Sequence, residues 1–185
     1  VPSEDEDFLF LSSGTWSLLG AERRQAECSE ESRMANFTNE GGYEKRYRYL
    51  KNIMGLWMVQ SVKKELGGAY GFGELSSMAE EASSFSSRVN VNDVGFLAPE
   101  SMTEAVKEYC RKTGQQEPQT VGELISCIDQ SLAESYGESI RELEKITGRK
   151  YSRLQIVGGG SQDAFLNRCT ARETGKEIWV GPTEA

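Results

Sequence analysis

The sequence predicts a mixed α/β fold. Short apolar runs bounded by small polar residues, a pattern typical of buried strands, occur near both ends of the chain. Between them lie longer segments in which apolar residues recur every three or four positions, which is typical of helices. The resulting order is strands, several helices, and then strand, helix, strand, which builds a sheet with helices packed against it. With 185 residues, the chain is long enough for one sizeable core.

The first part of the chain is expected to be mostly strands. Two apolar runs separated by Ser12–Thr15 indicate a hairpin, and the polar segment Glu22–Arg33 is expected to be a loop. The expected elements are strands over Phe8–Leu11, Trp16–Leu19 and Asn36–Thr38, followed by a turn at Gly41-Gly42.

The middle of the chain is expected to be helical. Leu50, Ile53, Met54, Trp57 and Met58 have helical spacing, which predicts a helix over Leu50–Leu66 that ends at Gly67-Gly68. Later helices are predicted over Gly73–Phe85, over Met102–Lys112, from the Thr120–Glu123 capping box to Gly148, and over Asp163–Thr174, with strands over Leu154–Val157 and Ile178–Val180.

Composition excludes several classes of function. The net charge of −8 is spread along the chain, which argues against a nucleic-acid-binding surface. The absence of histidine excludes Ser-His-Asp triads, Cys-His pairs and His-ligated zinc. No apolar run approaches the ~20 residues of a membrane span, and no signal peptide is visible. We expect a cytoplasmic protein without a nucleic-acid or membrane partner.

Two turns rich in glycine and hydroxyl groups each follow an apolar strand. Amides and hydroxyls in Ser12–Thr15 could cradle phosphate oxygens, although serine and glycine are also common in ordinary hairpin turns. The second turn is Gly158–Gly160, whose backbone a ligand could approach closely. The helix after it would offer free N–H groups and its positive dipole end to an anion. We therefore expect an anion at one or both turns, with tight structural turns as the alternative.

Asn52 and Gln60 form a third candidate. On the predicted helix they would share one face, roughly 12 Å apart at 1.5 Å per residue, and could contact two neighbouring ligands. The alternative is that both amides face water.

The four cysteines form no Cys-x-x-Cys pair, so no metal site is expected. Reduced thiols are the simplest expectation for a cytoplasmic protein. A bridge between Cys110 and Cys127 is geometrically open, but the sequence does not fix it.

Taken together, "SSGTWSLLG", "TNEGGYEKRYRYLKNIMGLWMVQ", "IVGGGSQDAFLN" and "VGPTEA" resemble the FGGY family of sugar kinases. The resemblance covers nearly the whole chain and corresponds to the second, nucleotide-binding half of such kinases. It implies an RNase H-like, actin-like ATPase fold. It also implies ATP-dependent phosphorylation of L-rhamnulose at O1, in L-rhamnose degradation, with Mg²⁺ bridging the phosphates.

The resemblance assigns roles to individual residues. Asn52 would touch the sugar, and Cys110 and Cys127 match positions that form a disulfide in some members. The residues implied to bind ATP are Gly14, Thr15, Gln60, Gly158, Gly159 and Gly160.

The resemblance also implies that a sugar-binding N-terminal half is absent from this chain. The family's general base is an aspartate of a His-Asp-Thr motif in that half, and no such motif occurs here. We therefore expect residues 1–185 to be a domain truncated at both ends, inactive by itself, with the N-terminal half of the same kinase as its partner. Another FGGY ketose kinase, such as one acting on fuculose, and a non-catalytic nucleotide-binding module on the same fold remain alternatives.

Overall fold

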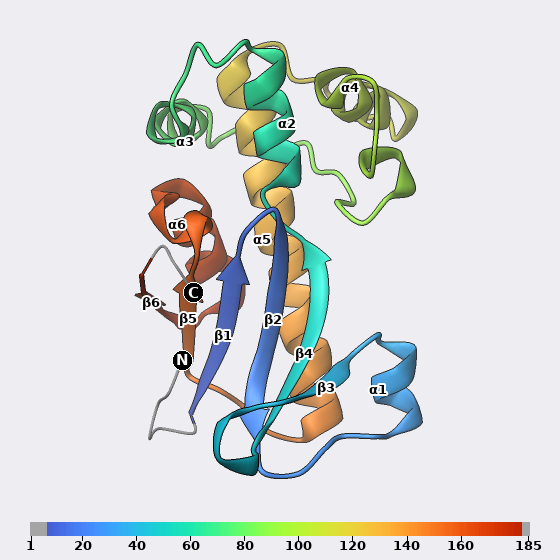
Figure 1. Ribbon diagram of the computed structural model, residues 1–185. Coiled ribbons are helices and arrows are strands. Elements are labelled where there is room, and N and C mark those ends of the chain that lie inside the picture. The colour runs from blue at the N-terminus through green and yellow to red at the C-terminus, as the bar shows by residue number, and fades with distance from the viewer. Residues whose placement is uncertain (1–6, 183–185) are drawn as a thin grey trace.

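The computed structural model describes residues 7–182. They form one six-stranded sheet, with helices along one of its faces and beyond one of its ends (Figure 1). The strands are β1 (Phe8–Ser13), β2 (Trp16–Arg23), β3 (Thr38–Gly41), β4 (Tyr47–Met54), β5 (Arg153–Val157) and β6 (Glu177–Val180). The helices are α1 (Glu30–Met34), α2 (Trp57–Glu65), α3 (Phe72–Glu81), α4 (Met102–Lys112), α5 (Val121–Thr147) and α6 (Ala164–Thr174), with 3₁₀ turns η1 (Tyr43–Lys45), η2 (Val94–Phe96) and η3 (Gly159–Gln162).

The sheet is antiparallel on one side and parallel on the other. The strand order is β3-β4-β2-β1-β5-β6, and the first four of these pair antiparallel with one another. β5 pairs parallel with β1 and with β6. Parallel neighbours need a long crossover connection. The chain between β1 and β5 contains the helices α1 to α5, and α6 connects β5 to β6. The predicted mixed α/β order is therefore confirmed.

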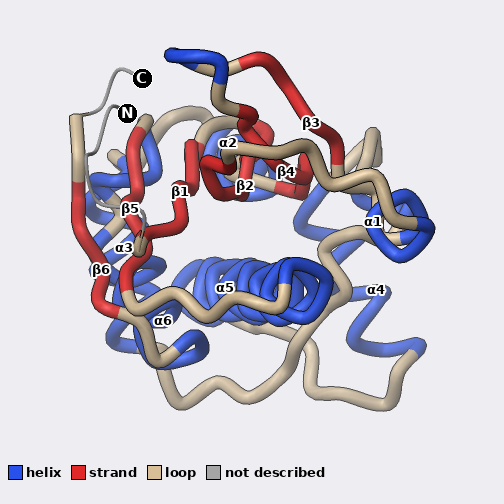
Figure 2. Tube along the Cα trace, turned by 90° about the horizontal axis from the view of Figure 1, so that it is seen from below, coloured by secondary structure: helices blue, strands red, loops and turns tan. Residues whose placement is uncertain are grey.

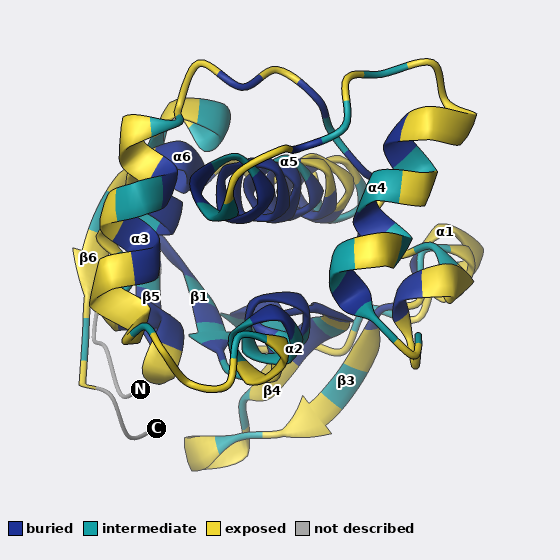
Figure 3. Ribbon diagram, turned by 90° about the horizontal axis from the view of Figure 1, so that it is seen from above, coloured by how far each residue is buried: buried dark blue, intermediate teal, exposed yellow. Residues whose placement is uncertain are grey.

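Helix α5 forms the centre of the core. In Figure 2, α5 and α6 lie on the same side of the sheet. Figure 3 shows that most of α5 is buried, whereas α3 and α4 turn exposed residues outward. The capping box predicted at the start of α5 is present. Thr120 Oγ1 accepts a hydrogen bond from Glu123 N–H at 3.1 Å, and the Glu123 carboxylate accepts one from Thr120 N–H at 3.3 Å. The helix ends at Gly148, whose φ of 66° is the left-handed conformation that glycine tolerates best.

The predicted helix over Leu50–Leu66 is wrong in its first third. Tyr47–Met54 form strand β4, and α2 begins only at Trp57. β4 lies between β2 and β3 and buries Leu50, Ile53 and Met54. Residues buried on both faces of a strand need not alternate, so their spacing can match that of a helix.

Smaller differences occur in the first fifty residues. The segment expected to be a loop contains the end of β2 and the short helix α1, and the third strand begins at Thr38 rather than Asn36. The other predicted helices and strands agree with the structure to within a few residues. Within residues 7–182, no helix combines the length and apolar character needed to cross a membrane.

Candidate functional site

The two glycine-containing turns lie side by side. β1 and β5 run parallel in a register that pairs Ser12 with Val157. The segments that follow these residues, Gly14-Thr15 and Gly158–Gly160, therefore leave the sheet at the same edge, below α2 in Figure 1. Ligands of open α/β sheets commonly bind at the carboxyl ends of the strands.

Packing explains two of the three consecutive glycines. Gly158 has a φ of 86°, and a Cβ added to it would come within 2.7 Å of the Ser13 carbonyl oxygen. A Cβ added to Gly160 would come within 2.6 Å of Ser13 Cβ. Both positions therefore need glycine to let η3 sit on the end of β1.

Gly159 differs from its two neighbours. It is exposed, its φ lies outside the left-handed range, and a Cβ added to it would meet no atom within 4 Å. Neither backbone conformation nor packing within the described chain requires a glycine here. Its effect is to leave the backbone open at this position, between two glycines that pack against Ser13.

The β1–β2 turn also forms the start of α2. The Gly14 and Thr15 carbonyls accept hydrogen bonds from the N–H groups of Leu56 and Trp57, at 2.8 and 3.1 Å. Thr15 Oγ1 donates to Gln60 Oε1 at 3.0 Å. The structure thus brings Thr15 and Gln60, 45 positions apart in the sequence, into direct contact at an exposed site.

The start of α6 is not the open anion site that the sequence suggested. Asp163 Oδ1 accepts from the N–H of Leu166 at 3.0 Å and from Ser76 Oγ at 2.7 Å. Ser76 Oγ in turn accepts from the N–H of Phe165 at 3.1 Å. Because side chains already satisfy these amides, the expectation of free N–H groups is wrong for them.

Asn52 and Gln60 do not share a helix face. Asn52 lies in β4 and pairs with Leu18, next to the pair Ser17–Ile53. Ser17 Oγ contacts Tyr136 of α5, so the neighbouring pair points to the opposite side of the sheet. Asn52 is thus an exposed residue on the sheet face away from α5, near the end of the strand that precedes α2.

Known proteins similar to this chain identify its family. Residues 9–185 match the model of the C-terminal domain of the FGGY family of carbohydrate kinases. The chain belongs to the FGGY family. It is 44% identical over 185 residues to a rhamnulokinase of Ligilactobacillus salivarius, which covers 100% of this chain and 38% of the relative. It is 42% identical over 179 residues to a rhamnulokinase of Halalkalibacterium halodurans, covering 97% and 38%. The FGGY chain described here thus spans about two fifths of the length of these relatives.

Solved structures confirm the fold of this FGGY domain. The xylulose kinase of Rhodospirillum rubrum superposes with a TM-score of 0.67 at 13% identity, covering 94% of this chain and 34% of that one. The activator of 2-hydroxyisocaproyl-CoA dehydratase from Clostridium difficile, solved with bound ADPNP, gives a TM-score of 0.53 at 14% identity, covering 98% and 55%. The expected actin-like ATPase fold is therefore confirmed.

Sequence reasoning missed the polar support beneath the FGGY domain's first turn. Ser17 Oγ and Tyr136 OH are 3.2 Å apart and both residues are fully buried. Burial raises the pKa of Tyr136 to about 12, so the phenol is neutral. Either hydroxyl can therefore donate the hydrogen bond between Tyr136 and Ser17. In the sequence, Tyr136 only continues the apolar stripe of α5, and nothing there signals its contact with the hairpin.

The structure contains no bridge between Cys110 and Cys127. Both are buried free thiols on α4 and α5, and their side chains lie in hydrogen-bonding contact. The disulfide implied by the resemblance stays a prediction.

Proposed function

We propose that this chain supplies the nucleotide-binding half of an ATP-dependent kinase that phosphorylates L-rhamnulose at O1, in the cytoplasmic degradation of L-rhamnose. Membership in the FGGY family supports a sugar kinase. The sequence identity of 40% or more to rhamnulokinases over nearly the whole chain supports L-rhamnulose as the sugar. The whole reaction belongs to the longer protein, since the relatives extend well beyond this chain.

The observation that carries the proposal is the open backbone at Gly159. Because packing does not require glycine there, we assign the missing side chain to close approach of a ligand. The exposed Thr15–Gln60 pair lies at the same edge of the sheet and supplies a hydroxyl and an amide. The ATP phosphates would lie between these two turns, with Gly14, Gly158 and Gly160 setting their shape.

Phosphoryl transfer depends mainly on positioning and on neutralising charge at the phosphates. In this chain the two turns would hold the nucleotide, and Asn52, exposed on the sheet face away from α5, would contact the sugar. The proton of the sugar hydroxyl would go to a carboxylate supplied by the N-terminal half. Mg²⁺ would add charge neutralisation when bound to the phosphates. Within residues 7–182 no group of three or more acidic or cysteine side chains could hold a metal, so we assign it no protein ligand here.

The proposal is tested by Gly159→Ala in the full-length kinase. The new methyl group meets open space in the protein, so the fold should be unaffected while the KM for ATP rises about tenfold, corresponding to about 1.4 kcal/mol. Gly41→Ala is the matched control, because Gly41 also has a φ outside the left-handed range and open surroundings, but lies in β3. Equal KM values for ATP in the two variants would overturn the nucleotide assignment.

The sugar is tested separately with a panel of ketoses. We expect kcat/KM of the full-length protein to be highest for L-rhamnulose. A higher value for fuculose would keep the kinase and change its substrate. Absence of turnover with every ketose, together with retained ATP binding, would indicate a non-catalytic nucleotide-binding module instead.

A further inference from the structure

An exposed tryptophan lies beside the first glycine-containing turn. Trp16 directly follows Thr15 and is the first residue of β2. Its side chain is 48% exposed, although tryptophan is on average a highly buried residue. Within residues 7–182, no aromatic ring stacks on the indole, no cation lies over it, and its N–H has no hydrogen-bond partner. No such interaction in the described chain therefore accounts for a large aromatic side chain at this position.

The strand register places Trp16 on the same face of the sheet as Asn52. Successive residues of a strand point to opposite faces, and Ser17 contacts Tyr136 of α5 on one of them. Trp16 and Leu18 therefore lie on the other face, away from α5. Leu18 pairs with Asn52 of β4, so Trp16 is the diagonal neighbour of Asn52. Such neighbours are about 7–8 Å apart, which is within reach of an aromatic side chain.

Polar and apolar side chains alternate across this face. Ser12 of β1 and Asn52 of β4 both pair with Leu18, one on each side of it. A hydroxyl and an amide thus flank an apolar side chain, and the indole of Trp16 extends the apolar surface toward the Thr15 turn. Small-molecule sites combine apolar and aromatic surface with a few polar groups in this way. Sugars match such a surface, because their C–H groups form apolar patches between their hydroxyls.

We propose that the indole of Trp16 packs against the C–H groups of the ketose whose hydroxyl receives the phosphate. This inference rests on the proposed function, which puts the phosphates at Thr15 and the sugar at Asn52. Transfer requires the acceptor oxygen to approach the phosphorus to about 3–3.5 Å. Trp16 is next to Thr15 in the chain and diagonal to Asn52 in the sheet. A ketose that extends from Asn52 to the phosphates therefore lies over the indole.

The test compares variants of the full-length kinase by their affinity for the ketose with the highest kcat/KM. Its Kd is measured by calorimetry with a non-hydrolysable ATP analogue bound. We expect Trp16→Ala to raise this Kd about tenfold, or about 1.4 kcal/mol, which corresponds to roughly 55 Å² of apolar contact. Trp16→Phe keeps a smaller ring and should raise the Kd only about threefold. The KM for ATP should be unchanged in both variants, because Thr15 and Gly159 are intact.

Trp179→Ala is the matched control. Trp179 is 50% exposed and also belongs to a strand, β6. β6 lies three strands away from β2 in the sheet, which is about 14 Å at 4.8 Å per strand. The Arg153 guanidinium carbon lies 5.0 Å from the centroid of the Trp179 ring, so this ring already has a partner. The Kd for the ketose and the KM for ATP should both equal those of the wild type.

Two results would overturn the inference and leave the proposed function standing. One is a Kd for the ketose in Trp16→Ala that equals those of the wild type and Trp179→Ala. The other is an equal loss of affinity for the ketose and for ATP, which would mean that the indole supports the fold or packs against the N-terminal half. A wild-type protein that binds no ketose would instead overturn the proposed function, and this inference with it.

Discussion

The side chain of Ser13 occupies the space into which a side chain on Gly160 would project. A Cβ at Gly160 would overlap Ser13 Oγ and come within 2.6 Å of Ser13 Cβ. The turn after β5 is therefore seated directly on the end of β1, and steric contact sets the spacing between the two glycine turns. Rotating the Ser13 hydroxyl would not relieve the overlap, because Ser13 Cβ is fixed by the backbone.

This contact predicts that Gly160→Ala is destabilising. Forcing a methyl group into a closely packed contact costs about 1–3 kcal/mol. The free energy of unfolding of the full-length protein, measured in urea, should fall by that amount. Gly159→Ala should change it by less than about 0.5 kcal/mol, since it meets open space. Adding Ser13→Gly to Gly160→Ala removes the overlapping atoms and should recover part of the loss. Equal stability of the two alanine variants would contradict the packing described here.

The contact between Thr15 and Gln60 predicts a difference between two substitutions at Thr15. Thr15→Val keeps the shape but removes the hydroxyl that donates to Gln60 Oε1, whereas Thr15→Ser keeps it. If this hydroxyl helps to hold the phosphates, Thr15→Val should lower kcat/KM for ATP about tenfold or more, and Thr15→Ser by much less. Steady-state kinetics at saturating ketose measures both. An unchanged value for Thr15→Val would exclude a phosphate role for this turn.

Local signals in the sequence predicted much of the fold. The Thr120–Glu123 capping box and the glycines at 148 and 175 define helix ends through interactions within a few residues, and the structure confirms them. Leu50–Met54 were misassigned to a helix, because a strand with buried residues on both faces loses the alternation of apolar and polar residues that identifies a strand. Gly55, which follows that strand, must be a glycine, since a Cβ there would overlap the Gly14 carbonyl oxygen and come within 2.8 Å of Ser17 Oγ. That contact becomes visible only once β2 and β4 are paired.

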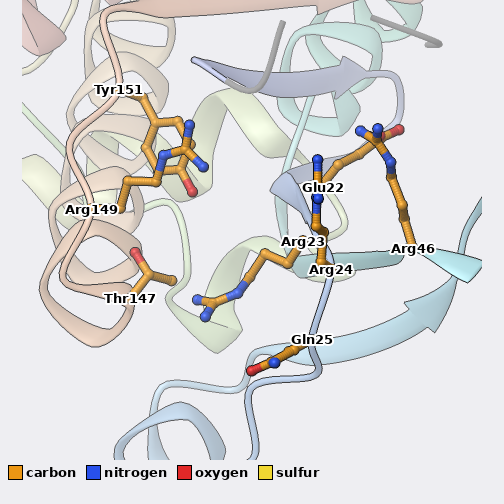
Figure 4. A pocket seen from close by; sticks show the side chains of 8 residues that line it. All are labelled: Glu22, Arg23, Arg24, Gln25, Arg46, Thr147, Arg149 and Tyr151. Atoms are coloured by element: carbon orange, nitrogen blue, oxygen red, sulfur yellow. The ribbon is translucent and has the colours of Figure 1, made fainter. Parts of the chain in front are cut away.

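The candidate site was only partly predictable for the same reason. Thr15 and Gly159 lie in turns that follow apolar strands, and this position identified both turns as candidate anion sites. Asp163 was correctly placed at the start of its helix, but the hydrogen bond that it accepts from Ser76 of α3 joins residues 87 positions apart, and no local pattern predicts it. A pocket at the opposite end of the sheet is lined by residues 22–25, 46, 147, 149 and 151 (Figure 4). The strand order brings these residues together, and no motif in the sequence predicts the pocket.

The cysteines differ in exposure, which predicts their reactivity. Cys28 is exposed, whereas Cys110, Cys127 and Cys169 are buried. Burial raises the pKa of Cys169 to about 11, and the hydrogen bond between Cys110 and Cys127 raises the pKa of Cys127. Under reducing conditions, a thiol reagent should label Cys28 rapidly and the other three only after unfolding, as peptide mass spectrometry would show. Rapid labelling of Cys110 in the folded protein would contradict the packing of α4 against α5.

Asp129 predicts how stability depends on pH. This residue of α5 is fully buried, and neither of its carboxyl oxygens has a hydrogen-bond partner within residues 7–182. Burial, followed by the nearby charge of Asp163, raises its pKa well above the usual value of 3.8. Below pH 3.8 the group is protonated in both the folded and the unfolded chain, so it does not oppose folding. Above that pH the unfolded chain releases the proton while the folded chain retains it.

Each pH unit between 3.8 and the raised pKa of Asp129 therefore lowers the free energy of unfolding by about 1.4 kcal/mol. Asp129→Asn removes the titration while keeping the shape. Its advantage over the wild type should grow as pH rises from about 4.5 to 7, when unfolding is followed in urea. Glu81→Gln removes an exposed carboxyl and serves as the control for the loss of one negative charge. If the difference between Asp129→Asn and the wild type does not change with pH, the carboxyl is not held protonated in the core.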